Sequence, residues 1–226
     1  MPAIHQRRPP SRILDPLTGL LLRAPEVAHA ANIVQAVEAS LPALKAYMPF
    51  AHLPQTEDTQ YDRLVKVCAD YWRGDDFHLH LFDAASGALL GGLGLHRKAH
   101  HAHAMEIGYW IRSDRAGQGL CTHAAQMAVA LAVHRFDCVR VQCVYDPSNA
   151  ASARVAEKVG FQVECDLPGF LPTGTDAMRA EGWRVSGTAR MTALSADRAR
   201  AQPWWDDLVA RLQWWDGQGR PVVDCA

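Results

Sequence analysis

The sequence predicts an α/β fold built on one mixed β-sheet. Segments whose apolar residues alternate with period two are interleaved with segments whose apolar residues recur every three or four positions. A strand-like segment also runs directly into a helical one through a glycine turn, in MEIGYWIRSDRAGQGLCTHAA at residues 105–125. The length of 226 residues fits one large domain or two small ones, and we favour a single domain over residues 1–226.

The N-terminal part is expected to hold a flexible leader over residues 1–12, a strand over residues 17–23 and two helical pieces. Pro25 lies where a helix favours its first residue. Apolar residues then follow helical spacing as far as Leu44, and Pro42 interrupts the stripe, which predicts the division into two pieces.

A further helix is predicted between Thr56, a favourable N-cap, and Gly74, a typical helix stop. Its apolar face is predicted to consist of Tyr61, Leu64, Cys68, Tyr71 and Trp72. After this helix, apolar residues alternate with period two in FHLHLF at residues 77–82, which predicts a strand. The residues of DAASG are typical of a turn, and ALLGGLGLH at residues 88–96 predicts a second strand. These segments predict a β-hairpin, followed by a polar loop at AHHAHAM, residues 99–105.

The remaining chain is expected to alternate strands and helices. The predicted strands cover residues 106–112, 138–144 and 182–194, and the predicted helices cover residues 118–134, the middle of 146–161, and 203–215. In the second of these helices Val155 and Val159 are expected to face inward. The region from residue 167 onward is less regular, and we expect the stretch LPGFLPTGTDAMRAEG to reshape or cover a binding pocket.

Composition argues against several classes of protein. The net charge is −1, from 23 Lys and Arg against 24 Asp and Glu, which gives no electrostatic footprint for nucleic acid or a membrane surface. No apolar segment is long enough for a signal sequence or a membrane span. The cysteines form no CxxC pair and are expected to be reduced thiols in the cytoplasm; they are Cys68, Cys121, Cys138, Cys143, Cys165 and Cys225.

The glycine turn is the segment that points to chemistry. Gly117 and Gly119 lie where a strand gives way to a helix, so backbone N–H groups there have no intrahelical partner and an anion can approach closely. The spacing lacks the Lys and Ser or Thr of the Walker loop and the third glycine of the dinucleotide fingerprint. A different phosphate ligand is therefore expected.

Two segments resemble one known family. EIGYWIRSDRAGQGLCTHAA, residues 106–125, followed by VYDPSNAASARVAEKVGF, residues 144–161, resembles the GNAT superfamily of acyl-CoA N-acyltransferases, most of all its RimJ/RimL branch of ribosomal-protein N-terminal acetyltransferases. The similarity runs through residues 14–166 and includes LKAYMPFAH and GGLGLH. It implies a mainly antiparallel mixed sheet with splayed central strands, flanked by helices, and acetyl-CoA as co-substrate.

In that family the pyrophosphate of acetyl-CoA lies on a turn whose pattern falls here on Ala116, Gly119 and Cys121. The side chain usual at the first of these positions is missing, but the backbone donors are retained. The resemblance therefore implies a cofactor loop formed by Ala116, Gly117, Gln118, Gly119, Leu120, Cys121 and Thr122. Asn149 matches the residue that orients the pantetheine arm, and Ser152 a small polar position near it. Both also suit an ordinary helix start.

Catalysis requires removal of a proton from the amine and its return to the leaving thiolate. Glu106 matches the strand position of a general base in many relatives; a structural hydrogen bond or ion pair is an equally good interpretation. The family's general acid, a tyrosine, is replaced by Ala156. Ser152, Tyr145 and water are candidates to replace it, and Cys143 is either an active-site thiol or a buried structural cysteine.

Two other groups of residues, histidines and tryptophans, could have binding roles, but a structural role is favoured for each. The histidines His96, His100, His101 and His103 are expected to lie in a solvated loop, and His78 and His80 on a half-exposed strand face, so no metal site is predicted. Trp204, Trp205, Trp214 and Trp215 are expected to pack on the sheet; a subunit contact or a wall of the acceptor pocket is the alternative.

The function expected from the resemblance is direct transfer of an acetyl group from acetyl-CoA to a primary amine in a ternary complex. The leading acceptor is a protein or peptide N-terminus, and a small amine such as an amino-acid-like toxin or antibiotic is the alternative. A second class of function is a non-catalytic acyl-CoA-binding sensor or interaction module. The protein is expected to be a monomer or homodimer, without a nucleic-acid or membrane partner.

Overall fold

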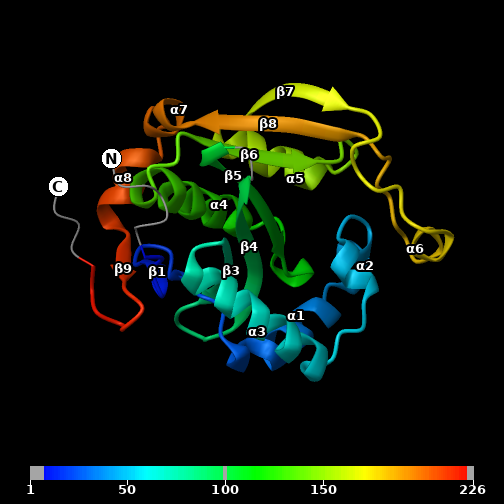
Figure 1. Ribbon diagram of the computed structural model, residues 1–226, viewed down its shortest axis with the longest axis horizontal. Coiled ribbons are helices and arrows are strands. Elements are labelled where there is room, and N and C mark those ends of the chain that lie inside the picture. Colours follow the sequence, from blue (N-terminus) through cyan, green and yellow to red (C-terminus); the bar gives the residue numbers. More distant parts are fainter. Residues whose placement is uncertain (1–7, 99–100, 223–226) are drawn as a thin grey trace.

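The computed structural model describes residues 8–98 and 101–222 (Figure 1). Its strands form one sheet in the order β7-β8-β6-β5-β4-β3-β2-β1-β9. The strands are β1 (Arg12–Asp15), β2 (Leu20–Arg23), β3 (Asp76–Asp83), β4 (Leu89–Lys98), β5 (His101–Ile111), β6 (Arg140–Tyr145), β7 (Gln162–Leu167), β8 (Ala189–Ser195) and β9 (Gln213–Trp215). Only β5 and β6 pair in parallel among these neighbours, so the mixed, mainly antiparallel sheet is confirmed.

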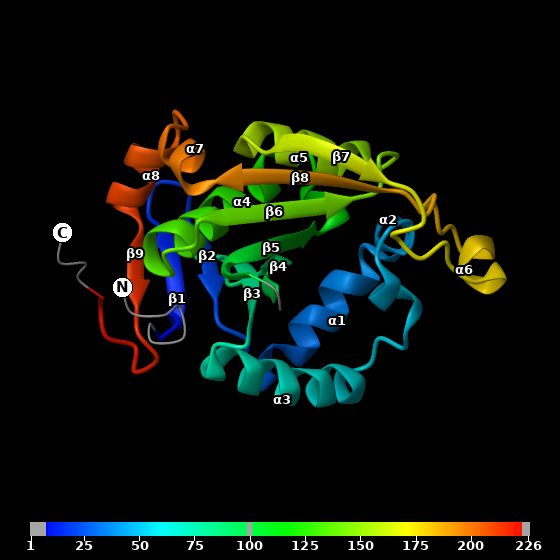
Figure 2. The same cartoon turned by 45° about the horizontal axis from the view of Figure 1, so that its top comes forward.

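Helices cover both faces of this sheet. The α-helices are α1 (Ala30–Glu38), α2 (Leu41–Lys45), α3 (Glu57–Arg73), α4 (Leu120–Ala130), α5 (Ala150–Val159), α6 (Asp176–Ala180), α7 (Ala196–Arg200) and α8 (Trp205–Arg211). Single 3-10 turns are η2 (Val27–His29), η3 (Pro49–His52) and η4 (Ser113–Arg115), and a π-helical turn, η5 (Leu131–Arg135), extends α4. Figure 2 shows α1 and α3 on one side of the sheet and α4 with α5 on the other.

The alternation of side chains along the strands gives each helical layer its own core. Phe77, Leu79 and Leu81 of β3 join the larger cluster, which contains α4, whereas Phe82 points to the opposite face and joins the cluster around α1. The α4 face is apolar almost throughout, and residues 124–125 and 127–133 are buried. The larger core therefore lies where α4 packs on β5, β4 and β2.

Several predicted elements are confirmed by local signals. Thr56 caps α3 by accepting a hydrogen bond from the backbone N–H of Thr59, and Gly74 ends the helix with a positive φ of 80°. The first helical stripe is divided as predicted, although the break falls at residues 39–40, and Pro42 lies in the first turn of α2, where proline is tolerated.

Other expectations are wrong at the ends of the chain. Residues 1–7 of the predicted leader lie outside the described residues, but Pro9 and Pro10 are buried, and the Pro10 carbonyl accepts a 2.5 Å hydrogen bond from the Tyr71 hydroxyl. Arg12 begins β1, and the predicted helix over residues 203–215 ends early because β9 pairs with β1. β1 has four residues and β9 has three, which is too few for an alternating apolar pattern to be recognised in the sequence.

The predicted polar loop at residues 99–105 is also wrong in its described part. Residues 99–100 lie outside the described residues, and β5 begins at His101, so β4 and β5 form a second hairpin with Ala104 and Met105 buried. On α3 the buried face is Gln60, Leu64, Val67 and Tyr71. The sequence predicts Tyr61 and Trp72 on the buried face, but both are about half exposed. The face of α3 that packs against the rest of the protein is rotated about the helix axis relative to the predicted face.

The five cysteines in the described part of the chain are free thiols, as expected, and Cys225 lies outside it. The predicted packing role of the C-terminal tryptophans is confirmed for Trp205 and Trp214, which are buried in the larger core cluster. Within the described ranges, no helix has both the length and the apolar character that crossing a membrane would need.

Asp15 joins β1 to two helices on the α4 side. Its carboxylate is fully buried and accepts hydrogen bonds from Arg211 Nε of α8 at 3.0 Å and from His123 Nε2 of α4 at 2.6 Å. Burial alone would raise the pKa of Asp15, but these hydrogen bonds, that from Arg211 foremost, outweigh it and lower the pKa. The folded state therefore favours the ionised carboxylate.

We expect Asp15→Asn to lower the free energy of unfolding by about 3 kcal/mol at pH 7, because Arg211 and His123 lose a buried counter-charge. A carboxylate whose pKa is lower in the folded state stabilises the fold above its unfolded pKa, and this contribution is lost on acidification. The difference between wild type and variant should thus shrink below about pH 4. Urea unfolding between pH 7 and pH 3.5 measures it, with the exposed α3 residue in Asp62→Asn as control. A difference that does not change with pH would contradict the argument.

Candidate active site

The two central strands separate partway along their length. β5 and β6 pair in parallel from Ala104 with Arg140 to Ile107 with Cys143, and no further. Beyond this point β5 continues on β4 alone as far as Ile111, and β6 continues on β8 as far as Tyr145. Among the strands of the described residues, none pairs with this edge of β5 beyond Ile107, and the predicted splay is confirmed (Figure 2).

A cavity of about 350 Å³ lies at this split. Gly108, Tyr109 and Trp110 line it from β5, and Val144 and Tyr145 line it from β6. The Tyr109 hydroxyl donates a 3.1 Å hydrogen bond to the Ser152 carbonyl of α5 and lies 3.5 Å from Cys143 Sγ. An extended ligand in the split would find free backbone hydrogen-bonding groups on β5, as an added strand does.

The glycine turn follows β5 directly. Gly117 and Gly119 both have a φ of 78°, a left-handed conformation that favours glycine, and Gly119 is the N-cap of α4. Within the described chain, the backbone N–H groups of residues 117–122 donate no hydrogen bond, and residues 113–119 are exposed. Open space surrounds the Cα of both glycines. The turn therefore presents unpaired donors at the positive end of a helix, which is an anion site.

The position of Asn149 is compatible with both roles considered from the sequence, helix N-cap and contact with the pantetheine arm. Its side-chain oxygen accepts a 3.1 Å hydrogen bond from the backbone N–H of Ser152, so it is the N-cap of α5. It also lines the cavity, as does Ser152. A contact of either residue with pantetheine stays a prediction.

Cys143 and Tyr145 lie on β6 at the cavity, as the proposed thiol and hydroxyl candidates require. Both are almost fully buried. Burial raises the pKa of the Cys143 thiol to about 11, so this thiol is neutral at physiological pH. Burial also raises the pKa of Tyr145, whose hydroxyl keeps its proton. Neither side chain is an anion that would form a covalent acyl intermediate readily.

Glu106 lies on β5 one residue before the strands separate. It stands opposite Gln142 of β6, and the Gln142 side-chain amide donates a 2.9 Å hydrogen bond to its carboxylate. Glu106 is not among the residues that line the cavity. The structural hydrogen bond considered from the sequence is thus present, and the role of general base stays a prediction.

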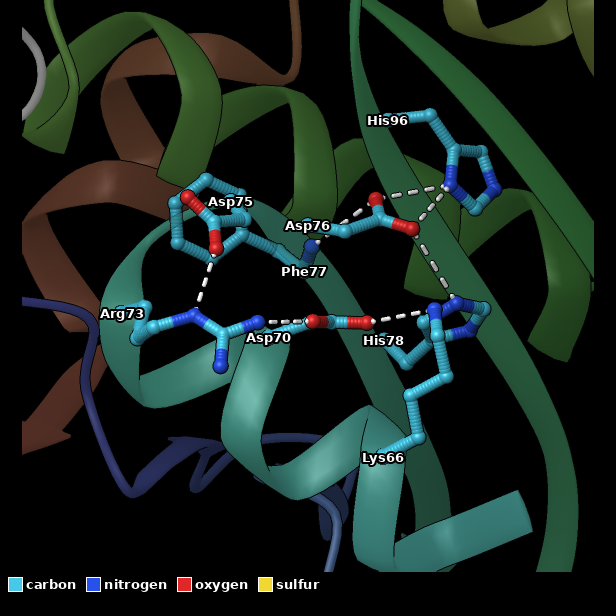
Figure 3. Close-up of polar contacts among 8 residues, drawn as sticks. All are labelled: Lys66, Asp70, Arg73, Asp75, Asp76, Phe77, His78 and His96. Atoms are coloured by element: carbon cyan, nitrogen blue, oxygen red, sulfur yellow. Dashed lines mark hydrogen bonds and ion pairs between the residues drawn. The ribbon is translucent and has the colours of Figure 1, made fainter.

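Sequence reasoning missed a polar cluster beside the cavity. Asp76 of β3 binds His96 of β4, with His96 Nδ1 at 2.8 Å from Oδ1, and lies 3.3 Å from His78 Nε2 (Figure 3). His78 and His96 line the cavity, although the sequence predicts solvated residues of a loop or a strand face. The ligand atoms of the three residues lie within 4.8 Å of one another, a spacing a metal ion could also use. The expected absence of a metal stays a prediction.

The signal for this cluster was weak. FHLHLF and GLGLH each place a histidine on an alternating strand, but only the strand register shows that Asp76 lies opposite His96. The far wall of the cavity was better anticipated, since Leu171, Pro172 and Trp183 of the irregular stretch after residue 167 line it. Glu181 secures this stretch by binding Lys45 and His52, each at 2.9 Å.

Comparison with known proteins agrees with this arrangement. Residues 19–162, more than half of the sequence, match the acetyltransferase (GNAT) domain family. The chain belongs to the GNAT family of acetyl-CoA-dependent N-acetyltransferases. Its relative YjcK of Bacillus subtilis, named a probable N-acetyltransferase, is 28% identical over 110 residues, which make up 48% of this chain and 61% of YjcK. The chain thus spans about three fifths of that relative.

Solved structures show the same fold. RimJ of Mycobacterium smegmatis, in complex with CoA-disulfide, superposes with a TM-score of 0.72 at 22% identity and covers 90% of this chain and 95% of RimJ. RimL, a ribosomal L7/L12 alpha-N-protein acetyltransferase, superposes with a TM-score of 0.69 at 20% identity, covering 80% of this chain and 96% of RimL. That RimL structure holds coenzyme A in a disulfide with a cysteine of the enzyme. The predicted family and fold are confirmed.

Proposed function

We propose that this protein transfers an acetyl group from acetyl-CoA to the N-terminal amine of a protein or peptide, by direct attack in a ternary complex. One observation carries the proposal: the free edge of β5 lines the cavity, and the same strand leads into the unpaired N–H groups of residues 117–122. An extended molecule with a diphosphate at one end and a thioester at the other suits this combination.

The residues at the site suit acetyl-CoA in two places. The diphosphate is assigned to the loop from Ala116 to Thr122, where backbone donors and the helix dipole favour an anion. The pantetheine arm is assigned to the free edge of β5 near Asn149. Bound in this way, acetyl-CoA supplies an acyl group activated as a thioester.

The protein contributes positioning and proton handling. Cys143 is neutral and buried, which favours direct attack by the amine over an acyl-cysteine intermediate. Tyr145 and Ser152 both line the cavity and carry hydroxyl groups that can return a proton to the leaving thiolate in place of the tyrosine absent at Ala156. Water is the alternative proton donor.

The acceptor is assigned from the shape of the cavity and from similar proteins. Tyr47, Met48 and Phe50 form one wall and Leu171 and Trp183 another, so the mouth is largely apolar and open to solvent. The names of RimL and of the ribosomal-protein-S5-alanine acetyltransferase of Vibrio fischeri state protein acceptors, and both share this fold. A peptide N-terminus is the acceptor that these observations favour.

Calorimetric titration with acetyl-CoA, followed by thiol release in the presence of N-terminal peptides and small amines, tests the proposal. We expect saturable binding and thiol release with peptides. Release with small amines alone would move the acceptor to the small-amine class. Binding without any release would support an acyl-CoA sensor, and absence of binding would contradict the proposal as a whole.

A further inference from the structure

The polar cluster of Asp76, His78 and His96 lies on the neighbouring strands β3 and β4, and α3 packs against β3 (Figure 3). His96 Nδ1 lies 2.8 and 3.0 Å from the two carboxylate oxygens of Asp76, and the ring of His78 stands edge-on to that of His96, with centroids 5.2 Å apart. Both histidines are only partly exposed. The cluster is thus a hydrogen-bonded unit rather than a group of independent surface side chains.

Strand register explains why these residues meet. Asp76 and His96 are directly opposite in the antiparallel β3–β4 pair, and His78 lies two residues further along the same face. The residues opposite His78 on the next two strands are Gly94 and Gly108, which have no side chain. The ring of His96 fills this space: a Cβ on Gly94 would lie 2.3 Å from His96 Nε2, and one on Gly108 would lie 3.8 Å from it.

The orientation of His96 follows from these contacts. Its Nδ1 is held by Asp76, while its Nε2 points over Gly94 toward Gly108, the first β5 residue beyond the pairing with β6. His96, Gly94 and Gly108 all line the cavity. When Nδ1–H donates to a carboxylate, the neutral imidazole carries its lone pair on Nε2. The basic atom of His96 is therefore on the cavity side.

The charge of Asp76 supports this arrangement. Burial raises the pKa of Asp76, but hydrogen bonds with His78 and His96 outweigh that effect and lower it, so the carboxylate stays ionised. In the described part of the chain, the titratable and charged groups near His96 include His78 and His80 on β3, Glu106 opposite it on β5, and Arg63 of α3 at the cavity wall. Of the two candidate bases, His96 lines the cavity and Glu106 does not.

We propose that His96 is the proton acceptor for the attacking amine and that Asp76 is its positioning residue. This inference rests on the proposed acetyl transfer. As the amine nitrogen forms its bond to the thioester carbonyl carbon, its proton passes to His96 Nε2. The carbon–sulfur bond then breaks, and the thiolate leaves with the electron pair and takes up a proton from Tyr145, Ser152 or water. His96 then releases its proton to solvent, and the group that protonated the thiolate takes a proton back from solvent.

The test compares His96→Gln, Asp76→Asn and Glu106→Gln in the full chain, with His103→Gln as control. His103 is an exposed histidine on β5 that does not line the cavity. We expect His96→Gln to lower kcat by about 100-fold or more without changing the acetyl-CoA Kd, since general-base catalysis contributes on that order. The fall of kcat/KM on acidification should also disappear, and His103→Gln should match wild type.

Two further measurements separate a chemical role from a structural one. Added imidazole should partly restore turnover in His96→Ala, because a free base can enter the space left by the ring. Asp76→Asn should lower kcat while the acetyl-CoA Kd stays unchanged, because His96 Nδ1 loses the carboxylate that orients its ring.

Several outcomes would overturn the inference. Wild-type pH dependence and turnover within about threefold in His96→Gln would exclude His96, and loss of the acid limb in Glu106→Gln alone would assign the base to Glu106. Loss of activity with a chelator and recovery with Zn²⁺ would make the cluster a metal site. In each of these cases acetyl transfer by the wild type still stands, whereas a wild type without thiol release overturns the proposed function itself.

Discussion

Gly119→Glu should abolish binding of coenzyme A. Gly119 begins α4 at a φ of 78°, and the space around its Cα is open, so the new side chain can be accommodated sterically. Its carboxylate would lie among the N–H groups assigned to the diphosphate. Juxtaposed like charges cost several kcal/mol, which corresponds to a Kd more than about 100-fold higher. Calorimetric titration with coenzyme A measures the change.

The chain offers a closely matched control in Gly87→Glu. Gly87 has a φ of 70°, and a Cβ added there would likewise have no other atom within 4 Å, but Gly87 lies in the turn between β3 and β4. Both variants should lose about 1 kcal/mol of folding free energy from the left-handed backbone. Only Gly119→Glu should lose coenzyme A. Normal affinity in a folded Gly119→Glu protein would disprove the assignment of the cofactor loop.

Phe136→Ala should cause the largest loss of stability among the substitutions considered. Phe136 follows the π-helical turn that ends the α4 helix, is completely buried, and stacks on Phe77 of β3 with ring centroids 4.5 Å apart. Removing the ring leaves a cavity at the contact between helix and sheet. We expect a loss of about 3–5 kcal/mol in the free energy of unfolding, measured by urea denaturation.

Phe170→Ala is the comparison for this variant. Phe170 lies in the stretch after β7 and is 58% exposed, so its truncation leaves no cavity and should change stability by less than about 0.5 kcal/mol. A loss below about 1 kcal/mol in Phe136→Ala would show that the contact of Phe136 with Phe77 does not carry the stability assigned to it.

Much of the molecule could be predicted from short stretches of sequence. The caps at Thr56 and Asn149 and the stop at Gly74 depend on residues a few positions away, and each is observed. The glycine turn belongs to the same kind of signal, because a helix N-terminus leaves its N–H groups unpaired whatever the rest of the chain does. Local chemistry was therefore enough to predict an anion site at this turn, and the resemblance of the surrounding segments to the GNAT family made it the expected cofactor loop.

Other predictions failed where distant residues decide the structure. β9 is a strand because it pairs with β1, although about 200 residues separate the two segments, and β1 itself lies between β2 and β9. The buried face of α3 was misjudged because apolar residues were assumed to face inward, whereas Gln60 is buried and Tyr61 is exposed. In both cases the partner surface, which lies elsewhere in the sequence, determines the outcome.

The turn and the helix ends could be predicted without a structure, because they follow from contacts between residues close along the chain. The tertiary structure alone decided which side chains share the cavity. Asp76 and His96 are 20 residues apart and meet only because the hairpin register places them opposite one another, above two glycines that leave room for the imidazole ring. A register shift of one residue would turn His96 to the other face of the sheet.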